Sequence, residues 1–92
     1  MNVEFGISPK VAWQVEQSEK YVYIQNVSNG NFYELEEVGR EIWLGIAMNK
    51  SFLQIEEDVA RQYNTSVAEI EQDIKVFMYE MLLSDLIVIK SL

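Results

Sequence analysis

The chain has 92 residues, of which 49% are hydrophobic, and its 15 acidic and 7 basic side chains give a formal net charge of −8. This length predicts a single domain over residues 1–92, and the negative charge disfavours a nucleic-acid partner, because proteins bind phosphates through lysine and arginine. The sequence contains no cysteine and no histidine, so it lacks thiolate nucleophiles, imidazole bases and nearly all zinc ligands; we expect no enzyme activity, no metal and no cofactor.

The amino-terminal segment MNVEFGISPK lacks the basic stretch and apolar run of a signal peptide. No apolar run reaches the roughly 20 residues that a membrane helix requires. The sequence also contains no internal repeat, low-complexity tract or linker. We therefore expect a soluble, cytoplasmic protein without a membrane partner.

The first half of the chain has the residue pattern of β-strands. Val11, Trp13 and Val15 alternate with the even-numbered residues of the segment 11–16, which is the period of a half-buried strand. Residues 21–27 (YVYIQNV) are β-branched and aromatic, and they lead into Asn29-Gly30, a strong signal for a two-residue hairpin loop. A third strand is expected over residues 31–35.

The expected hairpin register sorts the side chains of these strands onto two faces. With a two-residue loop, Val27 faces Phe32 and Ile24 faces Leu35. A meander leaves the strand at residues 31–35 on the edge of the sheet with unpaired N–H and C=O groups, unless the apolar tail at 86–89 covers it. The predicted core face consists of Val22, Ile24, Tyr33 and Leu35, and the more polar face of Tyr21, Tyr23, Gln25, Phe32 and Glu34.

Beyond Leu35 the apolar spacing lengthens to the helical period and predicts helices over residues 36–49, 51–64 and 66–84. The second and third open with capping boxes of the form Ser-x-x-Gln and Ser-x-x-Glu. The order β-β-β-α-α-α predicts the α+β fold class. Side chains expected in the core are Trp13, Trp43, Ile70, Ile74, Phe77, Met78 and Met81, whereas Val76, Tyr79 and Leu83 form a second apolar patch on the far side of the third helix.

The carboxylates at residues 36–37, 56–58 and 69–71 fall in early helix turns or on polar faces. They lack the spacing of a calcium-binding loop. We interpret them as solvated side chains rather than as a catalytic or metal site.

Apolar and acidic residues recur over most of the chain in the order and at the intervals of a known family. The matching positions are Tyr33-x-Leu35, Val38-Gly39, Ile42-Trp43, Ile55, Tyr63, Glu69-Ile70, Asp73-Ile74, Phe77-Met78, Met81 and Leu86. With this pattern the chain resembles the PqqD-like family of peptide recognition elements for ribosomally made, post-translationally modified peptides, and most of all the stand-alone leader-binding proteins of lasso-peptide biosynthesis. It departs from the usual pattern at residues 36–38, where members commonly have Asn, a variable residue and Thr, and at Asp85, where Gly is common.

The resemblance implies a winged helix-turn-helix-like fold in which the leader of a precursor peptide lies as an added antiparallel strand between the third strand and the third helix. It implies a non-catalytic adaptor that presents the leader to a leader protease and a cyclase, with the patch around Tyr79 as a bridging surface. The residues that it assigns to peptide binding are Asn31, Phe32, Tyr33, Glu34 and Leu35 on the strand and Asp73, Val76, Phe77, Glu80 and Leu83 on the helix.

Two other functions stay open at this point. One is a winged helix-turn-helix regulator that binds DNA, although Lys75 is the only basic residue of the third helix and stands among four acidic ones. The other is an accessory carrier for a different modified-peptide pathway, such as that of pyrroloquinoline quinone.

Overall fold

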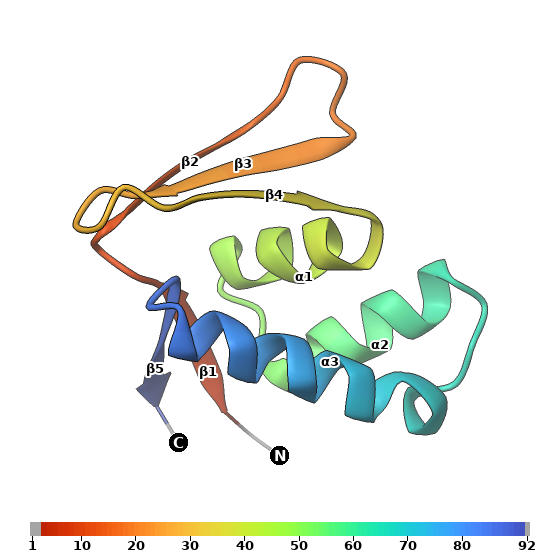
Figure 1. Ribbon diagram of the computed structural model, residues 1–92. Helices are drawn as coiled ribbons and strands as arrows, with labels where there is room; N and C mark the ends of the chain where they lie inside the picture. The colour runs from red at the N-terminus through yellow and green to blue at the C-terminus, as the bar shows by residue number, and fades with distance from the viewer. Residues whose placement is uncertain (1–2, 92) are drawn as a thin grey trace.

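The computed structural model describes residues 3–91 and has the α+β architecture that the sequence predicts. A three-stranded antiparallel sheet lies over α1, the helices α2 and α3 lie below, and a two-stranded sheet joins the two ends of the chain (Figure 1). The elements are β1 (Glu4–Ile7), β2 (Val11–Val15), β3 (Tyr21–Asn26), β4 (Phe32–Glu36), α1 (Glu37–Ala47), α2 (Phe52–Gln62), α3 (Val67–Leu83) and β5 (Ile87–Ser91).

The strands β2, β3 and β4 form the predicted meander, but the register predicted between β3 and β4 is wrong by two residues. Ile24 pairs with Tyr33 and Val22 pairs with Leu35, because the hydrogen-bonded pair of Asn26 and Asn31 closes a loop of four residues (27–30) rather than two. A shift of two keeps every side chain on its predicted face, since side chains alternate with a period of two. Val22 and Ile24 are accordingly fully buried, and Tyr33 and Leu35 are half-buried against the core.

The side chain of Asn26 explains the longer loop. Its Oδ1 atom accepts hydrogen bonds from the backbone N–H groups of Ser28 (2.9 Å) and Asn29 (3.3 Å), and its backbone carbonyl accepts one from Gly30 (2.8 Å). Gly30 has a φ of 79°, a conformation that favours glycine. The buried asparagine thus closes a wider turn in which Gly30 provides the left-handed residue.

The strands β1 and β5 pair antiparallel, with Phe5 opposite Ile89 and Ile7 opposite Ile87. The apolar tail is therefore a closing strand, but its partner is a strand at the other end of the chain that was not predicted. The alternative in which this tail covers the edge at β4 is wrong. A pairing between segments so far apart leaves no local signal in the sequence.

The core lies between the inner face of the sheet and the three helices. Trp43 of α1 is fully buried, as predicted, and Ile74, Met78 and Met81 of α3 are buried as well. On the far side of α3, Val76, Tyr79 and Leu83 expose 46%, 62% and 71% of their surface, which confirms the second apolar patch. The remaining core includes Phe5, Val22, Ile24, Ile42, Ile46, Phe52, Ile55, Val59, Leu86 and Ile87.

Trp13 is an exception to the predicted core. It lies opposite Ile24 on the inner face and its ring meets that of Trp43 edge to face, with centroids 6.0 Å apart. It nevertheless stays 38% exposed, because α1 packs against β3 and β4 and leaves the outer strand β2 overhanging.

The predicted capping residues begin both later helices. The Ser51 hydroxyl accepts the N–H of Gln54 (3.1 Å) while the Gln54 side chain accepts the N–H of Ser51 (3.2 Å), a complete capping box. Ser66 accepts the N–H of Glu69 (3.2 Å), but the Glu69 carboxylate accepts the Ser66 hydroxyl instead of its backbone N–H, so this box is only half formed. None of the helices in the described part of the chain is long and apolar enough to cross a membrane.

Candidate functional site

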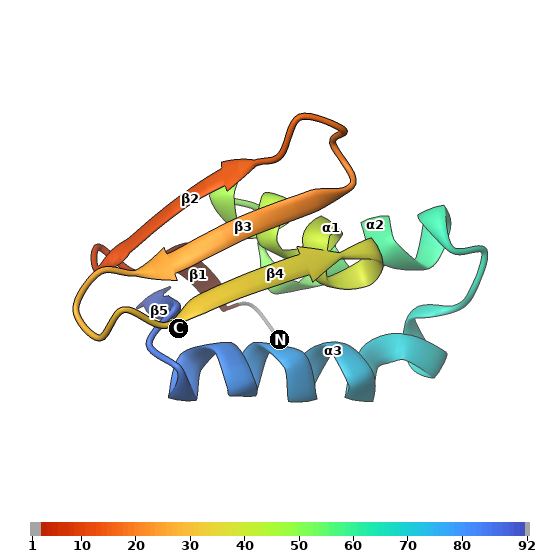
Figure 2. The same ribbon diagram turned by 45° about the horizontal axis from the view of Figure 1, so that its top comes forward.

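The strand β4 is one edge of the three-stranded sheet, and its free side faces α3 (Figure 2). In an antiparallel ladder, residues that bond to the neighbouring strand alternate with residues whose N–H and C=O point away. The hydrogen bond from the N–H of Asn26 to the C=O of Asn31 (2.9 Å) sets this alternation, so that Tyr33 and Leu35 bond to β3. The residues whose backbone groups point to the free edge are therefore Phe32, Glu34 and Glu36.

The side chains of β4 divide between two environments. Phe32 (61% exposed), Glu34 and Glu36 lie on the outer, solvated face of the sheet. Tyr33 and Leu35 are half-buried on the inner face, next to the core. A strand that joined this edge would continue both faces, with alternate side chains directed inward and outward.

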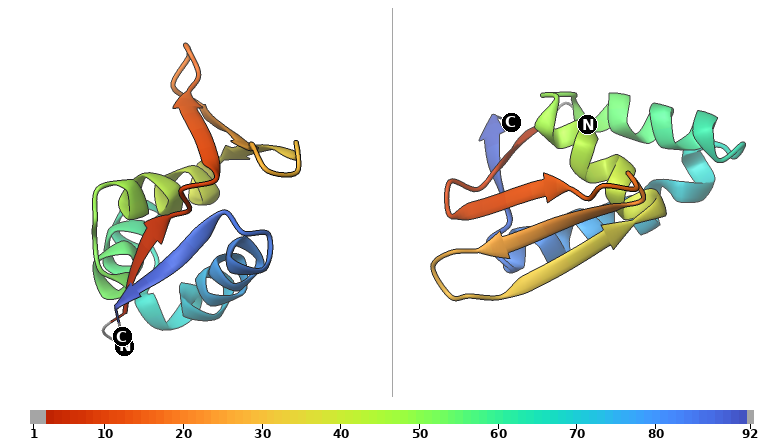
Figure 3. Two further views of the ribbon diagram at one scale, coloured as in Figure 1. Left: turned by 90° about the vertical axis from the view of Figure 1, so that its left-hand side faces the viewer. Right: turned by 90° about the horizontal axis from the view of Figure 1, so that it is seen from above.

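The helix α3 approaches the free edge through Phe77. A methyl group added at Gly39 would lie 3.2 Å from Cζ of Phe77 and 3.8 Å from Cβ of Leu35, so these three residues meet where β4 passes into α1. The view along the molecule in the left panel of Figure 3 shows β4 and α3 on the same side of α1. The half-buried ring of Phe77 thus supplies an apolar wall beside the inner face of the edge strand.

Two of the other predicted residues of α3 share one stripe of the helix with Phe77. Asp73 is four residues before it and Glu80 three residues after it. Val76 and Leu83 lie farther round the helix, towards Tyr79. All four are exposed, and the structure brings only Phe77 into contact range of the β4–α1 junction. Their proximity to a bound strand stays a prediction.

At the edge strand itself, the structure changes which backbone groups are available. Asn31 lies before β4, its carbonyl accepts the N–H of Asn26, and its N–H donates to Oδ1 of Asn29 (2.9 Å), so its backbone is occupied by the turn. Glu36 was not among the predicted residues, because the expected two-residue loop placed the end of the strand at Leu35. A four-residue loop closed by Asn26 would have identified it.

The free edge is strongly acidic. Five of the seven basic side chains form ion pairs elsewhere with Asp85, Glu41, Asp58 and Glu71. Among residues 3–91, no ion pair involves Glu34, Glu36, Asp73 or Glu80. Uncompensated carboxylates therefore lie along both the edge strand and the neighbouring helix.

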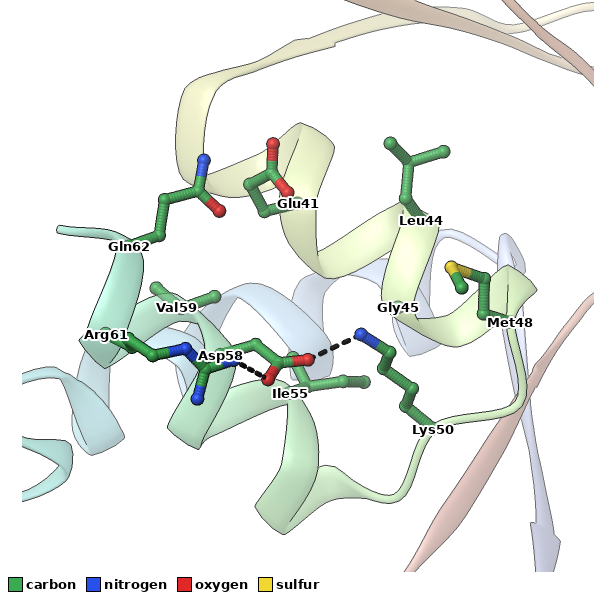
Figure 4. Close-up of a pocket in the computed structure, with 10 residues that line it drawn as sticks. All are labelled: Glu41, Leu44, Gly45, Met48, Lys50, Ile55, Asp58, Val59, Arg61 and Gln62. Carbon is green, nitrogen blue, oxygen red and sulfur yellow. Dashed lines mark hydrogen bonds and ion pairs between the residues drawn. The ribbon is translucent and has the colours of Figure 1, made fainter.

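A separate hollow of about 340 Å³ lies between α1 and α2, away from the edge strand (Figure 4). Inside it, Asp58 accepts hydrogen bonds from Lys50 (2.6 Å) and Arg61 (2.6 Å), which lower the pKa of Asp58 below its ordinary value. The carboxylate of Asp58 is therefore already paired with two cations inside this hollow.

Glu56 contradicts the interpretation of the carboxylates as solvated side chains. It is only 4% exposed, and its Oε2 atom has no hydrogen-bond partner among residues 3–91. Burial, and then repulsion by Glu71, raises the pKa of Glu56 above its ordinary value. No group of three acidic side chains in the described part of the chain is placed to hold a metal ion.

Comparisons with known proteins agree with this architecture. A family model described as coenzyme PQQ synthesis protein D (PqqD) matches residues 21–87, which are 67 of the 92 residues. A solved structure described as "TbiB1 in Complex with the TbiA(beta) Leader Peptide" superimposes with a TM-score of 0.82 at 21% sequence identity and covers 89% of this chain and 93% of that chain. A search of the curated proteins finds no significant match. The structural likeness at this identity shows a common fold.

Proposed function

The chain belongs to the PqqD family, and from this premise we propose that it binds the leader segment of a ribosomally made precursor peptide by accepting it as an added strand at the free edge of β4. The whole chain acts in this proposal as one peptide recognition domain. It is a binding protein rather than a catalyst, and its place of action is the cytoplasm. The observation that carries the proposal is the row of outward-facing backbone groups at Phe32, Glu34 and Glu36.

An exposed strand edge can bind an extended peptide through main-chain hydrogen bonds, while pockets for alternate side chains give specificity. The sheet has two edges, β2 and β4, but only the β4 edge has a helix beside it (Figure 2). Phe77 and Leu35 offer apolar surface to the inward-facing side chains of a peptide at this edge. The same fold in TbiB1, which was solved with a leader peptide, supports leader binding.

In its finer form the proposal places the chain in a pathway of the lasso-peptide type. The leader, once bound, is presented to a leader protease and a cyclase. The exposed surface around Tyr79 on α3 is the one that we propose for contact with one of these enzymes, because the core of the protein does not use it.

The proposal is tested with a labelled synthetic leader from the precursor gene that neighbours the gene of this chain. The variants are Glu34→Pro, which removes an outward-facing N–H group, and Glu34→Ala, which keeps that group and removes the same charge. We expect Glu34→Pro to bind about two- to tenfold more weakly than Glu34→Ala, the effect of one lost hydrogen bond, as measured by fluorescence anisotropy.

Val15→Pro is the matched control, since it removes an outward-facing N–H at the opposite edge, on β2. Leader affinity should survive this change. Equal affinities of Glu34→Pro and Glu34→Ala would show that no strand is added at β4. Absence of saturable leader binding, together with tight binding of duplex DNA, would support the DNA-binding alternative instead.

A further inference from the structure

The outer face of β3 and β4 is an uncovered surface on which aromatic rings and carboxylates alternate. The helices all lie on the opposite side of the sheet (Figure 1). The rings of Tyr21 and Tyr23 stack with centroids 6.4 Å apart, and Tyr23 meets Phe32 at 5.7 Å. The cross-strand pairs on this face are Tyr21 with Glu36, Tyr23 with Glu34 and Gln25 with Phe32.

The carboxylates on this face are available to a partner. Glu34 and Glu36 are exposed and form no ion pair within residues 3–91. Glu36 precedes α1, but its side chain does not cap that helix. Partial burial, followed by the negative charges of Glu34 and Glu16, raises the pKa of Tyr23, so the charge of Glu34 acts across this face.

An antiparallel strand joined to β4 would place three of its side chains on this face, opposite Glu36, Glu34 and Phe32 in the amino-to-carboxyl direction of the added strand. Directly opposed charges of opposite sign stabilise a strand pair, and like charges destabilise it. Aromatic rings add a further attraction for cations. Apolar side chains suit the position opposite Phe32.

We propose that the leader bound at β4 carries Lys or Arg at the two positions opposite Glu36 and Glu34, and an apolar residue two positions later. The pattern is basic-x-basic-x-apolar, and the inference rests on the proposed strand addition. It specifies the outward-facing side chains of the leader.

Both basic positions would face acidic surroundings. Glu36 lines a hollow of about 550 Å³ in which the acidic residues Glu19, Glu37 and Glu41 outnumber Lys20 and Arg40, and Arg40 is paired with Glu41. Glu34 has an aromatic partner, Tyr23, across the strand. Both positions should therefore favour a basic residue.

The test is a peptide array of the neighbouring-gene leader in which each position in turn is Lys, Gln or Glu, probed with the unaltered protein and with Glu34→Lys and Glu36→Lys. With the unaltered protein, two positions two residues apart should prefer Lys over Glu by about two- to fivefold in affinity. Glu34→Lys should reverse the preference at the second of these positions, so that Glu binds more tightly than Lys there. Glu36→Lys should do the same at the first.

Glu57→Lys on the exposed side of α2 is the control, because it changes the net charge by the same amount away from the edge. It should lower the affinity of basic peptides evenly and invert no position. If the leader binds but no position inverts in either edge variant, the charge pattern is wrong and strand addition stands. If the unsubstituted leader does not bind, both proposals are wrong.

Discussion

Glu56 is a buried carboxylate on α2 whose Oε2 atom lacks a donor among the described residues. Burial and the neighbouring charge of Glu71 raise its pKa in the folded protein above the value of an exposed glutamate. The folded state therefore binds a proton at this site more tightly than the unfolded chain does. Its contribution to stability is present below the ordinary pKa of glutamate and is lost as the pH rises through the raised value.

The substitution Glu56→Gln should remove this loss. We expect the variant to be more stable than the unaltered protein at pH 7 by about 1 kcal/mol, the order of the cost of one unsatisfied buried polar atom. The difference should shrink towards pH 4, and denaturant unfolding followed by tryptophan fluorescence measures it. Glu57→Gln, at the exposed neighbouring position, should change stability little at either pH. A Glu56→Gln variant that is less stable at pH 7 would contradict this account.

Asn26 and Glu56 mark the limit of what residue patterns predict. The alternation of apolar residues correctly assigned the side chains of β3 and β4 to the two faces of the sheet. The face of a side chain depends only on whether its position is odd or even. The register depended on whether Asn26 bonds to the loop, and the burial of Glu56 depended on how α2 packs. Both are tertiary contacts that a single sequence does not encode locally.

At the scale of elements, Gly45 lets α1 and α2 pack closely. A methyl group built on Gly45 would lie 2.8 Å from Cγ1 of Ile55, which is only 1% exposed. Real side-chain contacts are longer, so one of the two helices would have to shift. The glycine therefore serves helix packing rather than a turn.

Gly45→Ala should destabilise the protein by on the order of 1 kcal/mol, because overpacking of the buried Ile55 outweighs the gain in helix propensity. Gly39→Ala is the comparison, since its nearest neighbour is the half-buried ring of Phe77 at 3.2 Å, which has room to move. We expect Gly39→Ala to be at least as stable as the unaltered protein. Thermal unfolding by circular dichroism compares the two, and a Gly45→Ala variant as stable as Gly39→Ala would be inconsistent with the close packing.

Elements with strong local signals were predictable. The three helices follow from their apolar period, and α2 and α3 also from their serine caps, while the meander follows from its alternating strands. The strand β1 was not predictable, because its four residues include a glycine and its partner β5 lies at the other end of the chain. The free edge at β4 was predicted from topology, whereas the identity of its outward-facing residues required the observed register.

At the scale of the whole molecule, the pairing of β1 with β5 determines that the edge of β4 stays exposed. Because the closing strand joins the opposite end of the chain, it leaves the β4 edge uncovered beside α3. Exposed edges are a hazard for aggregation unless charge or a covering element protects them. Glu34 and Glu36 provide that protection against self-pairing and, in the proposed function, attract a basic leader.

Amide hydrogen exchange, followed by NMR with and without the leader peptide, tests strand addition at β4 most directly. In the free protein, the amides of Tyr33 and Leu35 should exchange slowly because they bond to β3, and those of Phe32, Glu34 and Glu36 should exchange fast. Saturation with the leader should slow the exchange of these three outward-facing amides and leave the β2 edge unchanged. Leader binding that leaves Phe32, Glu34 and Glu36 unprotected would contradict the account.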